Sequence, residues 1–171
     1  MGDSLITIVA IFLAAILMFV FPRAAISEMN DKEVLAMVQS YTTEFVNQIS
    51  SKGVITLEEY SAFIQKLNAT GNTYEVEFEV HISDTNPGKK TPNQQVGDTT
   101  YYVVYTKQIE DVLNSSSKKY PLKEGDYIVV FVKNTNTTIS QMFKMMLYNI
   151  SGNLSYIISA QASASVVTTG Y

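Results

Sequence analysis

The chain has 171 residues, no cysteine, and 12 basic against 16 acidic side chains, which gives a net charge of −4. The lack of cysteine excludes disulfides, thiolate metal ligands and a thiol nucleophile. No basic patch suggests nucleic acid as a partner. The sequence also shows no phosphate-binding loop, no pairing of a nucleophile with a base and no metal-ligand cluster, so we expect neither an enzyme nor a bound cofactor or metal.

Residues 5–21, LITIVAIFLAAILMFVF, form an unbroken apolar segment. The twelve Leu, Ile, Val and Phe side chains in it favour membrane insertion by about 4 to 7 kcal/mol in total. As a helix the segment is roughly 26 Å long, at the lower end of what spans a hydrocarbon core of about 30 Å. It therefore predicts a membrane anchor or filament-core helix. The residues expected to form this membrane or filament-core helix include Leu5, Ile8, Ile11, Phe12, Ala14, Ala15 and Phe19.

Three other interpretations of this segment stay open from the sequence alone. A cleaved secretory signal would use the small residues at 25–27, although the preceding MGDS holds no Lys or Arg. A buried core helix would also be apolar on all sides. Arg23 and Lys32 follow the segment and favour an inverted orientation. Because the rest of the chain combines few charges with many Asn, Ser, Thr and Tyr residues, we expect it to lie outside the cell.

The helical period continues beyond the anchor, since apolar side chains recur at three- and four-residue steps over 34–49. This pattern predicts one long rod over about 4–51, kinked or loosened at Pro22, which lacks an amide donor. Gly53 is the expected C-cap residue. The first part is apolar all round and the second is amphipathic, so the second part is expected to lie on a globular head.

The head is predicted to be one α+β domain of mixed helices and strands. A capping-box pattern at Thr56 opens a helix to about Leu67, and alternation over 74–83 predicts a strand with one buried face. The further expected elements are a polar loop at 84–98, a strand at 100–106, a short helix at 108–113, a strand at 127–133, a helix from Thr138 to about Tyr148 and a strand at 154–161. In the last helix we expect Met142, Met145 and Met146 to fill the core.

The polar side chains of the head favour surface roles. Glu75, Glu77 and Glu79 share one face of the expected strand, where they predict a solvated surface, because side chains along a flat strand diverge from any single calcium ion. The lone histidine, His81, is interpreted as a surface residue of the same strand. Lys89 and Lys90 lie in the polar loop, which is a candidate contact surface.

The plan of an apolar N-terminal helix with a proline near residue 22, an amphipathic continuation and a compact β-containing head resembles that of type IV pilins and pseudopilins. Two segments, FVNQISSKGVITLEEYSAFIQKLNATGNTYEVEFE at 45–79 and GDYIVVFVKNTNTT at 125–138, are similar to small membrane-anchored pilin-like proteins. Clostridial-type Gram-positive bacteria encode such proteins beside Tad-type pilus and secretion genes. The resemblance implies a structural subunit that is displayed outside the membrane, and it supplies no catalytic residue.

The corresponding fold is a long N-terminal hydrophobic helix that continues into an amphipathic helix and packs on a small, mostly antiparallel β-sheet head with short helices. We expect residues 1–30 to be the membrane or filament-core helix and residues 31–171 to be the extracellular head. The expected partners are other copies of the chain, a pilus or secretion assembly machinery and the membrane. Thr7 occupies the spacing at which pilins carry a glutamate, so Asp3 is the remaining candidate for pairing with a neighbouring N-terminal amine. The alternative is a membrane-anchored accessory module that does not polymerise.

Overall fold

The computed structural model describes residues 2–83, 101–148 and 158–170. Their elements, in chain order, are α1 (Gly2–Lys52), β1 (Val54–Thr56), α2 (Leu57–Asn68), β2 (Tyr74–Ser83), β3 (Tyr101–Tyr105), α3 (Thr106–Leu113), β4 (Lys119–Pro121), β5 (Tyr127–Asn134), α4 (Ile139–Tyr148) and β6 (Ser159–Ser165). The α+β fold, with a long apolar N-terminal helix and a small antiparallel sheet, confirms the predicted class and the pilin-like plan.

The main sheet contains four antiparallel strands in the order β3-β2-β5-β6. Its central pair is β2 and β5, in which Phe78 lies opposite Val130 and Val80 lies opposite Ile128. These bulky side chains form rows on the inner face of the sheet, which stabilises the pairing and supplies part of the core. A separate two-stranded sheet joins β1 to β4.

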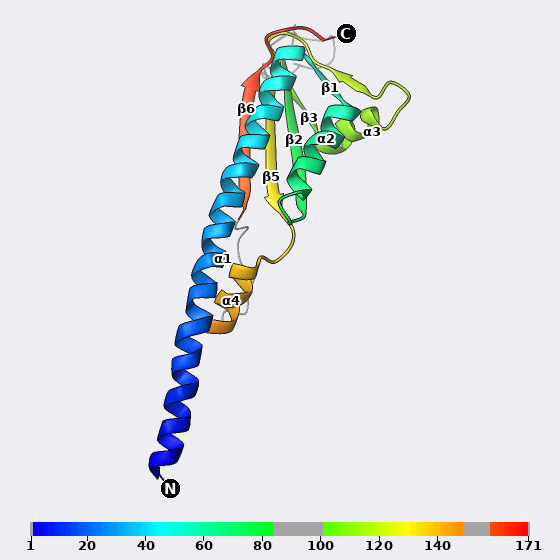
Figure 1. The fold of residues 1–171 in the computed structure, drawn as a ribbon. Coiled ribbons are helices and arrows are strands. Elements are labelled where there is room, and N and C mark those ends of the chain that lie inside the picture. Colours follow the sequence, from blue (N-terminus) through cyan, green and yellow to red (C-terminus); the bar gives the residue numbers. More distant parts are fainter. Residues whose placement is uncertain (1, 84–100, 149–157, 171) are drawn as a thin grey trace, which may run out of the picture.

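The C-terminal half of α1 covers the inner face of the sheet and packs on β6 and β5 (Figure 1). The inner face of β6 carries the small side chains of Ala160, Ala162 and Ala164, so the helix lies close to this edge of the sheet. Ser50 Oγ donates a hydrogen bond to the carbonyl oxygen of Ser165 at 2.6 Å, which fixes the end of the helix against the end of the strand.

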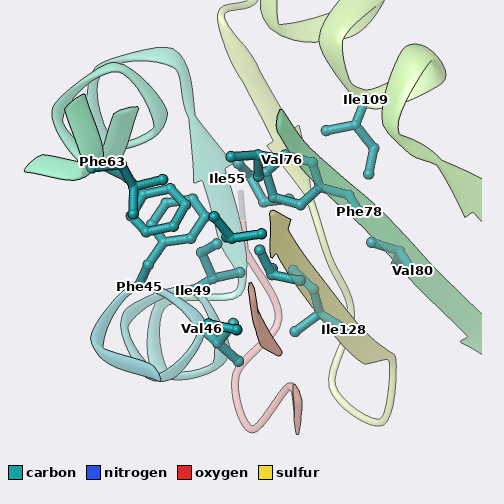
Figure 2. Close-up of a cluster of buried hydrophobic side chains, with 14 of the residues drawn as sticks. Phe45, Val46, Ile49, Ile55, Phe63, Val76, Phe78, Val80, Ile109 and Ile128 are labelled. Carbon is teal, nitrogen blue, oxygen red and sulfur yellow. The ribbon is translucent and has the colours of Figure 1, made fainter. Parts of the chain in front are cut away.

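The hydrophobic core lies between α1, α2 and the sheet (Figure 2). Phe45 of α1 stacks on Phe63 of α2 with ring centroids 4.3 Å apart, and it meets Phe78 of β2 edge-on at 6.2 Å. The predicted stripe of α1 is confirmed, because its buried members are Val34, Val38, Phe45, Val46 and Ile49. These contacts make the second half of α1 a structural part of the head.

The predicted helix ends are also confirmed. Gly53 follows α1 with a φ of +67°, and its amide donates to the carbonyl of Ile49 at 2.8 Å. Thr56 Oγ1 accepts a hydrogen bond from the backbone amide of Glu59 at 3.2 Å and so caps α2. These contacts satisfy backbone groups that the ends of a helix leave free.

The strands differ from the sequence prediction in two respects. The last strand runs from Ser159 to Ser165, whereas the sequence predicted a strand over 154–161, so the strand continues four residues beyond its predicted end. Residues 154–157 lie outside the described residues. The short strands β1 and β4 are not expected from the sequence, because three residues carry too little periodicity to predict a strand.

Candidate membrane-anchoring and assembly surface

The N-terminal half of α1 extends away from the head, and its apolar segment is bare (Figure 1). None of its most apolar stretch is buried within the protein, which contradicts the interpretation of residues 5–21 as a core helix of this chain. The side chain of Phe12, for example, is 69% exposed. The residues named for the membrane or filament-core helix are all exposed in the chain, namely Leu5, Ile8, Ile11, Phe12, Ala14, Ala15 and Phe19.

Within the described residues, α1 is the one helix that is long and apolar enough to cross a membrane. An N-terminal signal sequence is apolar in the same way. Both a retained anchor and a signal sequence are segments that insert into a membrane, and α1 contains a candidate for such a segment. The helix runs without interruption through Pro22, which lies just beyond the apolar segment. The missing amide of Pro22 removes one backbone hydrogen bond, and the predicted kink there stays a prediction.

Beyond the apolar segment, Asp31 joins α1 to α4. The residue is only 7% exposed, and its carboxylate accepts hydrogen bonds from two hydroxyl groups at the start of α4. One is Thr138 Oγ1, at 2.8 Å from Asp31 Oδ2, and the other is Ser140 Oγ. The negative charge therefore lies at the N-terminal end of α4, where the helix dipole and the free backbone amides favour an anion. These contacts attach α4 to the long helix.

A second polar contact lies further along the same pair of helices. Lys144 Nζ of α4 is 3.1 Å from Glu28 Oε1 of α1. Asp31 contacts Ser140, whereas Glu28, earlier in α1, contacts Lys144, later in α4. The two helices are therefore antiparallel. Figure 1 shows α4 beside α1, between the sheet and the free N-terminal part of the helix.

The prediction that the methionines of α4 fill the core is wrong. Met142 is 59% exposed, Met146 is 75% exposed and Met145 also lies at the surface, as does Ile139. The buried residues at the start of α4 are polar instead: Thr138, Ser140 and Gln141. The physical reason is that α4 packs on a polar section of α1, so the polar side chains at its start face inward and its methionines face outward.

The outer face of the sheet is acidic, as predicted, but it is partly neutralised. Lys133 of β5 lies 2.6 Å from Glu77 and 3.1 Å from Glu75, measured between charged atoms. Hydrogen bonds with Glu77 and then with Glu75 raise the pKa of Lys133. Among the described residues, no cluster of three or more His, Cys, Asp or Glu side chains has the arrangement of a metal site.

His81 is half-buried beneath aromatic rings, so its interpretation as an open surface residue needs refinement. Its ring lies 4.8 Å from that of Tyr101 and 5.9 Å from that of Tyr127, measured between centroids. Its Nε2 is 3.6 Å from the carboxylate of Glu79, which is beyond a hydrogen bond. The site is an aromatic cluster on the outer face of the sheet, at the ends of β2, β3 and β5.

A part-buried polar contact joins α2 to α3 in the head. Tyr60 of α2 donates a hydrogen bond from its hydroxyl group to Glu110 Oε1 of α3 at 3.0 Å. Burial raises the pKa of Tyr60, and the hydrogen bond to the Glu110 carboxylate raises it further. The phenol therefore stays protonated at neutral pH and joins two helices, which is a structural role.

Three predicted site residues cannot be placed on this surface. Lys89 and Lys90 lie outside the described residues, and the side chain of Asp3 is not described. Their roles in surface contact and in N-terminal charge pairing stay predictions.

Sequence reasoning missed Asp31, although a signal for it exists. Asp31 precedes Val34 by three residues and Val38 by seven, so it falls on the buried stripe of α1. A charged residue on such a stripe must find a polar partner, because an unpaired buried charge is costly. The partners, Thr138 and Ser140, are distant in the sequence and show no pattern that links them to Asp31.

Comparison with known proteins gives no relative for this chain: no family model, no curated protein and no solved structure matches it.

Proposed function

We propose that this protein is a pilin-like structural subunit of an extracellular filament, stored in the membrane by residues 5–21 and assembled by bundling of its N-terminal helices. The observation that carries the proposal is the continuity of α1, whose first half is bare and apolar while its second half is built into the head. One rigid element thus links the candidate anchor directly to the globular part. A flexible tether would not fix the head relative to a helical core.

The apolar segment suits both environments that such a subunit needs. The segment is apolar on all sides, so the same side chains can be buried either in lipid or among copies of the same helix. Ala10, Ala14 and Ala15 provide small positions at which neighbouring helices approach closely. Repeated head-to-tail contacts between different patches of each copy would extend without closing, as a filament requires.

The proposal includes a location and a set of partners. The helix is inserted in the cytoplasmic membrane with the head outside the cell, and the filament lies on the cell surface. The partners are other copies of the chain and a pilus or secretion assembly machinery, which extracts the subunit from the membrane. The proposal contains no catalytic step.

The test is electron microscopy of material sheared from cells that express the chain, with an antibody against the head as the label. Ala14→Trp places a bulky ring at a small position of the anchor, while Phe12→Trp on the same helix changes the volume little and serves as the matched control. We expect labelled filaments for the wild type and for Phe12→Trp, and none for Ala14→Trp at equal membrane levels. Intact mass spectrometry of the membrane fraction checks that residues 5–21 are retained.

Two outcomes would overturn the proposal. Loss of the apolar segment from the mature protein would identify it as a signal sequence. Retention of the whole chain in the membrane, with no labelled filament under any condition, would leave an anchored accessory module that does not polymerise.

A further inference from the structure

The reversed polarity of α4 needs an explanation that the head alone does not provide. A helix on a protein surface normally turns its apolar side inward and its polar side to water. In α4 the buried side carries Ser140 and Gln141, while Met142 and Met146 are 59% and 75% exposed. An outward apolar side indicates an apolar or amphipathic environment around this part of the molecule.

The position of α4 along α1 indicates what that environment is. Lys144 pairs with Glu28, which follows Phe21, the last residue of the apolar segment, by seven residues or about 10 Å of helix. Because α4 runs opposite to α1, Met146 lies two residues nearer to the segment, at roughly 7 Å from the level of Phe21. The headgroup layer on each side of a bilayer is about 5 to 8 Å thick.

The exposed surface of α1 at the same level fits the headgroup layer as well. Ile26 of α1 is also exposed near this level, so the apolar surface of α1 extends beyond the apolar segment. Arg23 is also exposed and lies two residues after the apolar segment, at the level where phospholipid phosphates are found. The amphipathic character of this surface, apolar with a cation beside it, is that of membrane-interfacial protein segments.

We propose that the C-terminal turn of α4 is a second membrane contact, in which Met145 and Met146 rest in the headgroup layer beside the point where α1 leaves the bilayer. The contact fixes the tilt and the rotation of the head on the membrane, because two elements instead of one then touch the lipid. Asp31 and Glu28 hold α4 in place for this contact. The proposal requires that residues 5–21 cross the membrane, and it does not depend on assembly into filaments.

The test uses the natural absence of tryptophan from this chain. Single-tryptophan variants of the full chain are placed, one chain per nanodisc, in phosphatidylcholine and phosphatidylglycerol that contain a headgroup nitroxide quencher. Met146→Trp probes the proposed contact, and Met142→Trp and Ile139→Trp probe positions one and two turns further from the membrane. Val167→Trp, at an exposed site near the C-terminus of the head, is the matched control.

We expect Met146→Trp to show a blue-shifted emission and a clear loss of fluorescence with the quencher. The loss should decrease from position 146 to 142 to 139, and Val167→Trp should show none. Phe12→Trp, quenched by bromine on the acyl chains, reports independently that the anchor is inserted. Because the chain has no cysteine, Met146→Cys with an environment-sensitive dye repeats the measurement without a ring in the helix.

Two results would overturn the membrane contact. In the first, Met146→Trp and the labelled Met146→Cys behave like the head control while Phe12→Trp is quenched, so α4 stands clear of the lipid. In the second, the blue shift appears without headgroup quenching and only when several chains share a nanodisc, so another copy of the chain covers α4. If the protein forms no filaments, the fluorescence results for α4 keep the same meaning. The membrane contact and the proposed filament function can therefore be refuted independently of each other.

Discussion

Replacement of Asp31 by alanine should release α4 from α1 and leave the head folded. Asp31 is buried and accepts hydrogen bonds from Thr138 and Ser140. A hydrogen bond to a charged group contributes about 1.5 to 3 kcal/mol, and the two bonds share one carboxylate, so we expect a loss of about 2 to 4 kcal/mol. The loss is local, since α1 is the main packing partner of α4 among the described elements.

The assay is hydrogen exchange of the full chain in nanodiscs, measured by mass spectrometry. At about 1.4 kcal/mol for each factor of ten, the amides of α4 should exchange roughly 30 to 700 times faster in Asp31→Ala. A ten-residue helix has little stability by itself in water, so undocking and unfolding of α4 should occur together. The amides of β2 and β5, at the centre of the sheet, should exchange at the wild-type rate.

Two control variants make this prediction specific. Glu33→Ala removes an exposed acid from the same helix and should leave exchange of α4 unchanged. Asp31→Asn keeps one oxygen acceptor and should have an intermediate effect. The reasoning is refuted if Asp31→Ala leaves α4 as protected as in the wild type, or if β2 and β5 lose protection to the same extent.

Three further predictions concern the head, each measured by chemical or thermal unfolding of the full chain in detergent. Phe45→Ala should lower the free energy of unfolding by about 3 to 5 kcal/mol, because it removes a stacked ring from the core; a cost below about 1 kcal/mol would contradict the packing in Figure 2. Gly53→Ala should destabilise more than Gly125→Ala, since both have positive φ but an added Cβ at Gly53 would lie 1.9 Å from a backbone oxygen, and equal effects would contradict this close contact. The pKa of Lys133 is raised by the carboxylates beside it, so the stability lost in Lys133→Met should be constant from about pH 7 to pH 9.5 and should disappear only as the pH rises through the folded pKa. A difference that fades near neutral pH would contradict this ion pair.

Local sequence patterns correctly predicted the elements that form through contacts between residues close together in the chain. The three- and four-residue period of α1, the alternation of β2 and the capping box of α2 each place the decisive side chains within a few positions of one another. The caps are fixed by bonds that span three or four residues, such as that between Thr56 and Glu59. These features were therefore readable without knowledge of the rest of the molecule.

The strand β6 shows where local patterns are insufficient. Its residues, SAQASAS, have little intrinsic preference for a strand. They form one because alanines fit beneath α1, while the alternate polar side chains face outward. Propensity predicted that the strand ends at residue 161, four residues before its end at Ser165, since propensity responds to bulky apolar side chains and not to the space that a helix leaves.

The sequence by itself determined that the chain has a long helix with an apolar first half, and that the other half must bury a stripe against an α+β head. It also determined that a helix begins near Thr138, because both bonds of that capping box are local. Only the tertiary structure decided which side of α4 faces inward. That choice depends on Asp31, which lies 107 residues before Thr138 in the chain and draws the polar side of α4 inward because a buried carboxylate requires hydrogen-bond donors.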